Sequence, residues 1–237
     1  MRARLLQLTP TPVRTALRHL RGAALTLYAR VITPIRLRQK DFRTPTRIHL
    51  GCGPRILPGW INTDSSINRT GGILYVNLAK PLPFPGDVAA FVFSEHVHEH
   101  LPYKDGLQLL REVYRVLAPS GVLRLAVPNL DFYLRLHTEK NHHDQFIREW
   151  HQMAKPDAPA DALTMINDVF MNYGHRYIYD FDGLRRQLES AGFRNIREFE
   201  PGKSDVADLA NLETNPLMRG NTLALHIAYT LCVEATK

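Results

Sequence analysis

The feature that most constrains the fold of this 237-residue chain is a repeated unit, a short apolar run followed by an amphipathic stretch and a second apolar run. VAAFVF (88–93) is nearly all apolar, as expected of a strand buried on both faces. KDGLQLLREVYRVL (104–117) has helical spacing, APSG (118–121) is a stop-and-turn signal, and VLRLAV (122–127) alternates. Such units predict a parallel sheet with right-handed crossovers.

Other segments extend this order on both sides. Short strands are predicted at 47–50, 60–64 and 73–78, and later ones at 193–200 and 223–237. FDGLRRQLESAGF (181–193) is predicted to be a helix with Gly192 as its C-cap. Residues 129–175 interrupt the alternation just after a strand's C-terminal end. Because open α/β sheets bind ligands along that edge, we expect this helical insertion to lie beside a ligand.

The positive charge is concentrated at the N-terminus. Residues 1–47 hold eleven Lys/Arg and one acid, whereas the rest of the chain holds 19 bases and 22 acids. Residues 1–46 are therefore interpreted as a basic arm, with an amphipathic helix at about 12–32 that Pro34 ends. Its apolar face could pack on the domain or lie on an anionic membrane. Nucleic-acid binding ranks lower, because Tyr28 is the arm helix's one aromatic residue.

The apolar runs and the cysteines indicate the cellular compartment of the protein. No apolar run approaches the roughly 18 residues of a membrane span. The two cysteines, Cys52 and Cys232, have no metal-site spacing, which argues against a disulfide framework or a zinc site. We therefore expect a cytoplasmic protein, in which residues 12–33 are the candidate segment for a contact with the inner membrane face.

The segment LGCGPRILPGWINTDSS (50–66) contains a glycine pair, Gly51 and Gly53, and an acid, Asp64. Glycines let a backbone approach a ligand closely, and a carboxylate at a strand end can accept hydrogen bonds from both ribose hydroxyls. From these residues alone, a cofactor site and a tight structural turn both stay open.

Four stretches occur in the same order as in a known family, and this resemblance favours the cofactor site over the structural turn. They are HLGCGPRILPGWINTD, LAKPLPF, FSEHVHEHL with REVYRVLAPSG, and YIYDFDGLRRQLESAGF. Residues 47–237 resemble the class I S-adenosylmethionine-dependent methyltransferases, and more narrowly a type 11-like subgroup with LGCG before GWxxxD. The resemblance implies a Rossmann-like α/β fold. Its sheet would have seven strands, mainly parallel, with an antiparallel last strand and helices on both faces.

The resemblance also implies S-adenosylmethionine as the cofactor. The residues expected to bind it are Gly51, Cys52, Gly53, Asp64, Ser65, Asn77, Leu78, Ser94 and Glu95. Three departures are visible. His49 and Asn77 stand where many members of the family have acids, and the PRILPGW loop replaces the usual first helix. The Asn77 carbonyl oxygen could still accept a hydrogen bond from the adenine amine.

Histidines supply most of the candidate acid/base groups. In SEHVHEH (94–100), His96 and His100 would share one helix face while His98 points away, and the segment is not HExxH, so no metal is predicted. A hydroxyl acceptor needs a base near the transferred methyl. The catalytic candidates are His175, His96 and Asp131, ahead of His137, His142 and His143.

The predicted function is O-methylation of a cell-surface saccharide or glycolipid precursor, with residues 129–175 as a cap on the acceptor side. Two alternatives remain at this point. An RNA methyltransferase would use the basic arm to bind phosphates. A non-catalytic binding module would keep the fold while lacking the acids replaced by His49 and Asn77.

Overall fold

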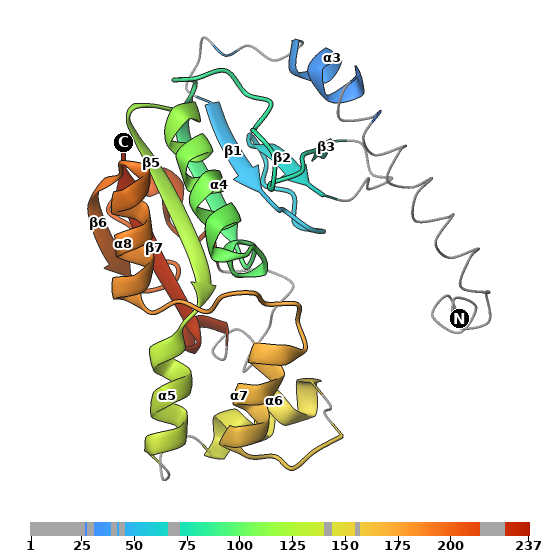
Figure 1. Cartoon of the computed structure of the whole chain (residues 1–237), viewed down its shortest axis with the longest axis vertical. Coiled ribbons are helices and arrows are strands. Elements are labelled where there is room, and N and C mark those ends of the chain that lie inside the picture. Colours follow the sequence, from blue (N-terminus) through green and yellow to red (C-terminus); the bar gives the residue numbers. More distant parts are fainter. Residues whose placement is uncertain are drawn as a thin grey trace, which may run out of the picture.

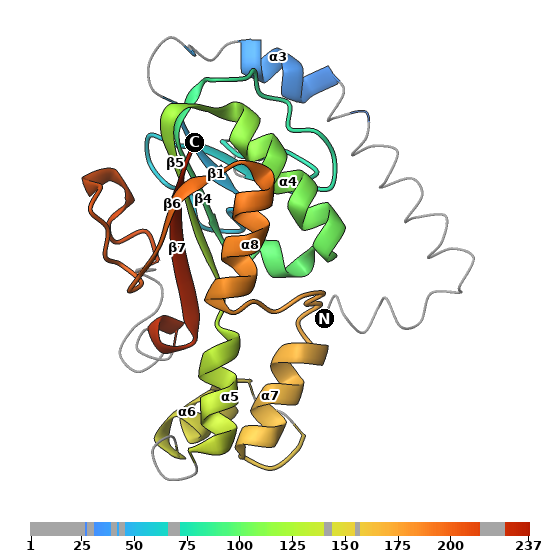
Figure 2. The same ribbon diagram turned by 60° about the vertical axis from the view of Figure 1, so that its left-hand side comes forward.

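A computed structural model describes residues 27, 31–38, 42, 46–65, 72–139, 144–154, 157–213 and 226–237. Most of the predicted arm helix at 12–32, together with His142 and His143, lies outside these residues. Figures 1 and 2 show a central sheet with helices packed against it and a group of three helices at one end.

The sheet has seven strands in the order β3-β2-β1-β4-β5-β7-β6. The strands are β1 (Thr46–Leu50), β2 (Ile61–Asp64), β3 (Leu74–Tyr75), β4 (Ala89–Glu95), β5 (Leu117–Pro128), β6 (Arg194–Phe199) and β7 (Thr230–Thr236). Pairings among β1 to β5 are parallel, and β7 runs antiparallel to both β5 and β6. The predicted fold class, including the antiparallel last strand, is confirmed.

Strand β4 is buried on both faces, as its apolar sequence predicts. Val92 belongs to the main core, where it meets α4 (Tyr103–Val116) and α8 (Phe181–Ala191). Phe93 faces the other side, where the 3-10 helix η3 (Ala207–Leu209) and the loop around Trp60 cover the sheet. Helix α8 ends at the predicted cap, because Gly192 adopts a left-handed φ of 107°.

The predicted helical insertion contains α5 (Leu130–Thr138), α6 (Asp144–Ala154) and α7 (Ala162–Met171). These helices have an apolar cluster of their own, which includes Tyr133, Trp150 and Met165. The Asn129 side chain accepts a hydrogen bond from the Asp131 backbone and so caps α5. Figures 1 and 2 place the three helices below the C-terminal end of β5, separate from α4 and α8.

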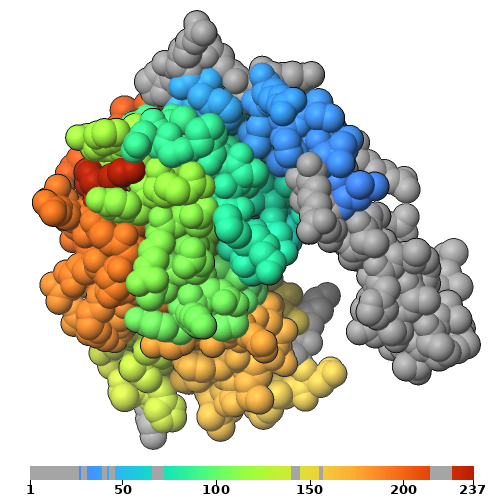
Figure 3. Space-filling view, turned by 45° about the horizontal axis from the view of Figure 1, so that its top comes forward, coloured from blue at the N-terminus to red at the C-terminus, as the bar shows by residue number. Residues whose placement is uncertain are grey.

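Part of the predicted arm packs on the domain. Helix α3 (Thr33–Arg38) buries Leu37 in the main core, and the Thr33 hydroxyl donates a 3.0 Å hydrogen bond to the Tyr75 carbonyl of β3. Figure 3 shows α3 in blue against the blue-green surface of this region. The prediction that Pro34 ends a helix is wrong, because residues 31 and 32 form a π-helical turn that leads into α3, and the helix continues past Pro34 to Arg38.

Two other boundaries differ from the predictions. Residues 118–121 were expected to form a turn but belong to β5, where Ser120 takes a φ of 65° as the pairing with β4 shifts register. Residues 226–229, which were expected in the last strand, form a helical turn before β7. Within the described ranges, no helix combines the length and the apolar character that a bilayer crossing requires.

Candidate functional site

The turn after β1 is built around its first glycine and an acid from β2. Gly51 has a φ of 67°, and a side chain at this position would overlap Val97. The Asp64 carboxylate accepts a 2.9 Å hydrogen bond from the Gly53 backbone, while the Cys52 N–H donates to the Thr63 carbonyl at 2.8 Å. A turn that requires glycine and a fixed acid therefore occur together at the C-terminal ends of β1 and β2.

A cavity of about 340 Å³ opens at this turn and is here called the glycine-turn cavity. Its lining comes from the ends of the parallel strands and the loops that follow them: Gly51, Asp64, Ser65, Asn77, Leu78, Ala79, His96, Val97, His100 and Leu101. The structure thus brings together five of the residues expected to bind the cofactor. The Asn77 side-chain oxygen accepts a 3.0 Å hydrogen bond from the Ala79 backbone, which fixes its orientation.

Four other expected residues do not line this cavity. Gly53 and Cys52 lie in the turn itself, and burial, reinforced by the Asp64 charge, raises the pKa of the Cys52 thiol to about 11. Ser94 is buried and its hydroxyl donates to the Leu50 carbonyl at 3.3 Å. Glu95 joins two segments, with Arg55 Nη1 and His226 Nε2 each 2.9 Å from its oxygens.

The PRILPGW loop stands where the family resemblance implies a helix. One side chain of β2, that of Asn62, holds this loop in place. The Asn62 amide donates to the carbonyls of Leu57 and Trp60, both at 3.0 Å, and its oxygen accepts from Leu57 N–H at 2.9 Å. His49 Nδ1 lies 3.2 Å from the same oxygen. His49, which stands where related domains have an acid, therefore supports the loop from inside the sheet.

His49 should make the stability of the domain depend on pH. It is 2% exposed, and burial lowers its pKa from 6.5 to about 4, although the Asn62 hydrogen bond partly opposes this. An unfolded chain therefore takes up this proton first as the pH falls from 6.5 toward 4. We expect the free energy of unfolding to decrease over that window by up to about 3 kcal/mol on this account.

The measurement is urea unfolding at pH 7.5 and 4.5, for the natural protein and for His49→Gln, which keeps a donor for Asn62. The variant should lose about 2–3 kcal/mol less than the natural protein between the two values. Equal losses would show that His49 is not the group responsible.

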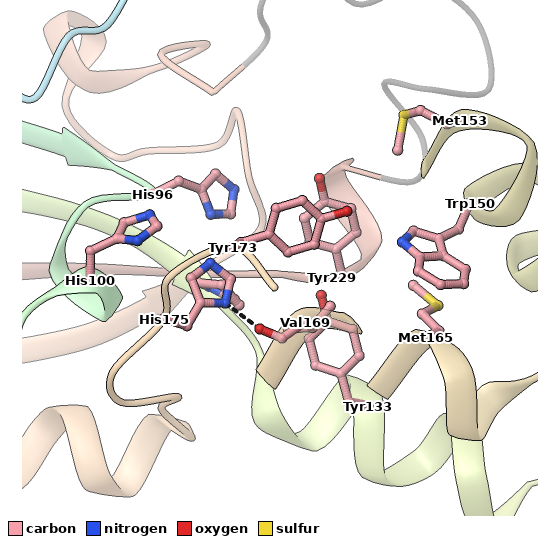
Figure 4. A pocket seen from close by; sticks show the side chains of 11 residues that line it. His96, His100, Tyr133, Trp150, Met153, Met165, Val169, Tyr173, His175 and Tyr229 are labelled. Carbon is pink, nitrogen blue, oxygen red and sulfur yellow. Dashed lines mark hydrogen bonds between the residues drawn. The ribbon is translucent and has the colours of Figure 1, made fainter. Parts of the chain in front are cut away.

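A second cavity of about 320 Å³ lies between the sheet edge and the three inserted helices, and is here called the aromatic cavity. Its lining is mostly aromatic and apolar: His96, His100, Pro128, Tyr133, Trp150, Met153, Met165, Val169, Tyr173, His175 and Tyr229. Figure 4 shows the three histidines at one end, with Trp150 and Met165 at the other. His96 and His100 line both cavities, so the two spaces adjoin at these side chains.

His96 follows β4 in a strained left-handed conformation, with a φ of 50°. Its Nδ1 lies 3.2 Å from Glu99 Oε1, and its Nε2 is 3.5 Å from the Thr230 hydroxyl. Burial disfavours the charged forms, but the mutual hydrogen bond outweighs burial, so the pKa of His96 is raised and that of Glu99 is lowered. His96 is thus a base whose basicity a buried carboxylate increases.

The other acid/base candidates occupy different settings. His175 reaches the aromatic cavity, with Nδ1 2.6 Å from the Val169 carbonyl, and burial lowers its pKa. Asp131 is exposed on α5 and lies outside both cavities, as does His137. The structure therefore brings His96 and His175 together and leaves Asp131 apart.

Sequence reasoning missed several residues that shape the site. Glu99 is not among the candidates named from the sequence, and neither are Trp150 and Tyr229, which line the aromatic cavity. Helical spacing in the inserted segment was the available signal, because an amphipathic face next to a ligand edge predicts which side chains turn inward.

The sheet order, the glycine turn and the acid at the end of β2 define the class of S-adenosylmethionine-dependent methyltransferases. A family model described as a methyltransferase domain matches residues 31–198, more than half of the chain. The chain belongs to this family, and it is an S-adenosylmethionine-dependent methyltransferase. The match begins at residue 31 and therefore includes α3, which the sequence assigned to the arm.

Solved structures similar to the chain include three methyltransferases. A methyltransferase from Archaeoglobus fulgidus is 18% identical, with a TM-score of 0.49, and the match covers 87% of this chain and 93% of that one. One from Mesorhizobium loti is 20% identical, with a TM-score of 0.46 and coverages of 81% and 90%. A possible histamine N-methyltransferase from Thermotoga maritima is 14% identical, with a TM-score of 0.46 and coverages of 94% and 97%. No curated protein matches the chain.

Proposed function

We propose that the chain transfers a methyl group to a hydroxyl of an acceptor in the aromatic cavity, with His96 as the base. The observation that carries this proposal is the position of His96, which lines both cavities and is hydrogen-bonded to buried Glu99. A hydroxyl is a weak nucleophile until its proton is removed, so a positioned base is the group this chemistry needs.

The residues around the two cavities would have distinct roles in the transfer. The cofactor, bound by Asp64 and the Gly51 turn, supplies an electrophilic methyl on a sulfonium. The Nδ1–H of His96 would donate the hydrogen bond to Glu99. The lone pair on Nε2 is then free to accept the proton of the acceptor hydroxyl. The new O–C bond forms as the S–C bond breaks, with its electron pair going to sulfur. Glu99 stabilises the imidazolium that results.

The lining of the aromatic cavity supports a ring-shaped acceptor with few charges. Among its described lining residues there is no lysine, arginine, aspartate or glutamate, which disfavours a phosphate-rich acceptor such as RNA. Tyr133, Trp150 and Tyr229 offer flat apolar faces, and the tyrosines add hydroxyl groups. We propose a saccharide unit of a cell-surface polysaccharide or glycolipid precursor, with α5 to α7 as the cap that encloses it.

The test uses methyl-labelled S-adenosylmethionine with a panel of saccharides and extracted glycolipids, and compares the natural protein with His96→Gln. We expect kcat to fall by about 10²–10⁴-fold in the variant, while the dissociation constant for the cofactor changes little. For the natural protein, the rate should rise with pH through a value above the ordinary pKa of histidine, because Glu99 raises the pKa of His96.

The matched control is His137→Gln on the exposed side of α5, which should behave as the natural protein. Transfer by His96→Gln at the natural rate would exclude His96 as the base. Cofactor binding without transfer to any saccharide or lipid fraction would count against the acceptor class.

A further inference from the structure

We propose that Glu99, His100 and His175 form a binding site for a divalent transition-metal ion, of which Zn²⁺ is the best match, at the junction of the two cavities. Their ligand atoms all lie within 4.8 Å of one another. The site rests on its own geometry, whereas the role suggested below for the ion also rests on the proposed function.

The three side chains converge from two distant segments. His175 Nε2 is 4.0 Å from Glu99 Oε1, and the rings of His100 and His175 have centroids 4.9 Å apart. Figure 4 shows these two rings beside each other at the histidine end of the aromatic cavity. Metal–ligand bonds of about 2.0–2.2 Å imply ligand atoms roughly 3.3 Å apart in a tetrahedral site. His100 is exposed, so a small rotation of its ring can close that difference.

A second observation points to a missing partner at this place. Glu99 Oε2 is buried and finds no hydrogen-bond partner among the residues that the structure describes, and the side chain is 0% exposed. An unpaired buried carboxylate oxygen costs free energy unless an ion or donor satisfies it. A cation bound by this carboxylate together with His100 and His175 would satisfy that oxygen. Oε1, which lies 4.0 Å from His175 Nε2, also holds the hydrogen bond with His96.

The surroundings also orient one of the imidazoles as a ligand. His175 Nδ1 is 2.6 Å from the Val169 carbonyl, so this nitrogen carries the proton and Nε2 presents its lone pair toward Glu99. A metal-bound histidine typically donates its other N–H to a carbonyl or carboxylate in this way. His98 is not part of the set, because its Nε2 is bonded to Gln187 at 2.7 Å on the far side of the segment.

Two imidazoles and one carboxylate are ligands suited to Zn²⁺, with Mn²⁺ and Fe²⁺ as close alternatives. A three-residue set leaves at least one position open, and here that position borders both cavities, because His100 lines both. An acceptor hydroxyl that binds there would have its pKa lowered by the ion. His96, which is hydrogen-bonded to the same carboxylate, could then remove the proton.

The experiment titrates Co²⁺, as the probe ion, into tag-free full-length protein that has been stripped with a chelator, and follows visible absorption and calorimetry. We expect one equivalent to bind and Zn²⁺ to displace it. His100→Ala and His175→Ala should each weaken binding by at least about 10-fold. Glu99→Gln should do the same, and the exposed control His137→Ala should not change it.

Absence of stoichiometric binding would overturn the metal site, and so would binding that is unchanged in both His100→Ala and His175→Ala. Circular dichroism and thermal unfolding check that each variant is folded. The two proposals fail separately. Methyl transfer that persists at the natural rate in metal-free protein would leave the proposed function intact and remove the ion's catalytic role. Metal binding without methyl transfer would leave the metal site intact and count against the proposed function.

Discussion

Replacement of Arg124 by methionine should lower the free energy of unfolding by about 3–5 kcal/mol. Arg124 lies on β5, is 0% exposed, and forms two hydrogen bonds with Glu213, of 2.6 and 2.8 Å, besides one with Glu234 of β7. Burial would raise the pKa of Glu213, but the guanidinium outweighs burial and lowers it. Without Arg124, two buried carboxylates would face each other with no cation.

Urea unfolding at pH 7.5, followed by circular dichroism, measures the effect. The matched control is Arg197→Met, because Arg197 pairs with Asp205 at 2.7 Å but both side chains are more than 60% exposed, and the change should be below about 1 kcal/mol. The triple variant with Glu213→Leu and Glu234→Leu should recover part of the loss. Recovery stays partial, because Glu213 also accepts the buried Gly202 N–H. Equal effects of Arg124→Met and Arg197→Met would contradict this account.

Asp64→Asn should weaken S-adenosylmethionine binding by about 100-fold. The expected role of the carboxylate is to accept hydrogen bonds from both ribose hydroxyls, and bonds to a charged group are worth about 1.5–3 kcal/mol each. Asparagine keeps the shape and one acceptor oxygen, so the hydrogen bond from Gly53 N–H can persist. The loss would therefore report the charge and the second acceptor rather than a collapsed turn.

Calorimetry with S-adenosylmethionine and with its demethylated product measures this change. Asp205→Asn, at an exposed aspartate far along the chain, is the control and should bind as the natural protein does. Unchanged affinity in Asp64→Asn would remove Asp64 from the cofactor site. A parallel fall in thermal stability would instead assign it a structural role in the turn.

Local patterns in the sequence were sufficient for most of the fold. The apolar run at 88–93, the helical spacing before Gly192 and the β-then-α order predicted β4, α8 and the sheet. These features are determined by residues that are neighbours in the sequence, so local patterns are enough to predict them. No local pattern predicts that the helix continues past Pro34 to Arg38, because α3 is held by a contact with β3, which lies far along the chain.

Less of the site could be predicted from the sequence, because its contacts join segments that are far apart in the chain. Gly51, Asp64 and Asn77 are predicted to bind the cofactor because they occupy fixed places after successive strands, and they line one cavity. The pairing of Glu99 with His96 is local, but its approach to His175 requires the loop after α7 to fold back beside β4. Glu95, which is predicted to bind the cofactor, pairs with Arg55 and with His226. Its contact with His226 spans 131 residues, and no sequence spacing predicts it.

The place of β7 between β5 and β6 also sets an order of events during synthesis. In the described part of the chain, β6 pairs with β7 alone, and β7 supplies Glu234 to Arg124. While a ribosome is still making residues 230–236, β1 to β5 can assemble, but one side of β5 and all of β6 lack a neighbour. The nascent chain therefore exposes two open strand edges until this segment emerges, which is the interval when chaperones would protect it most.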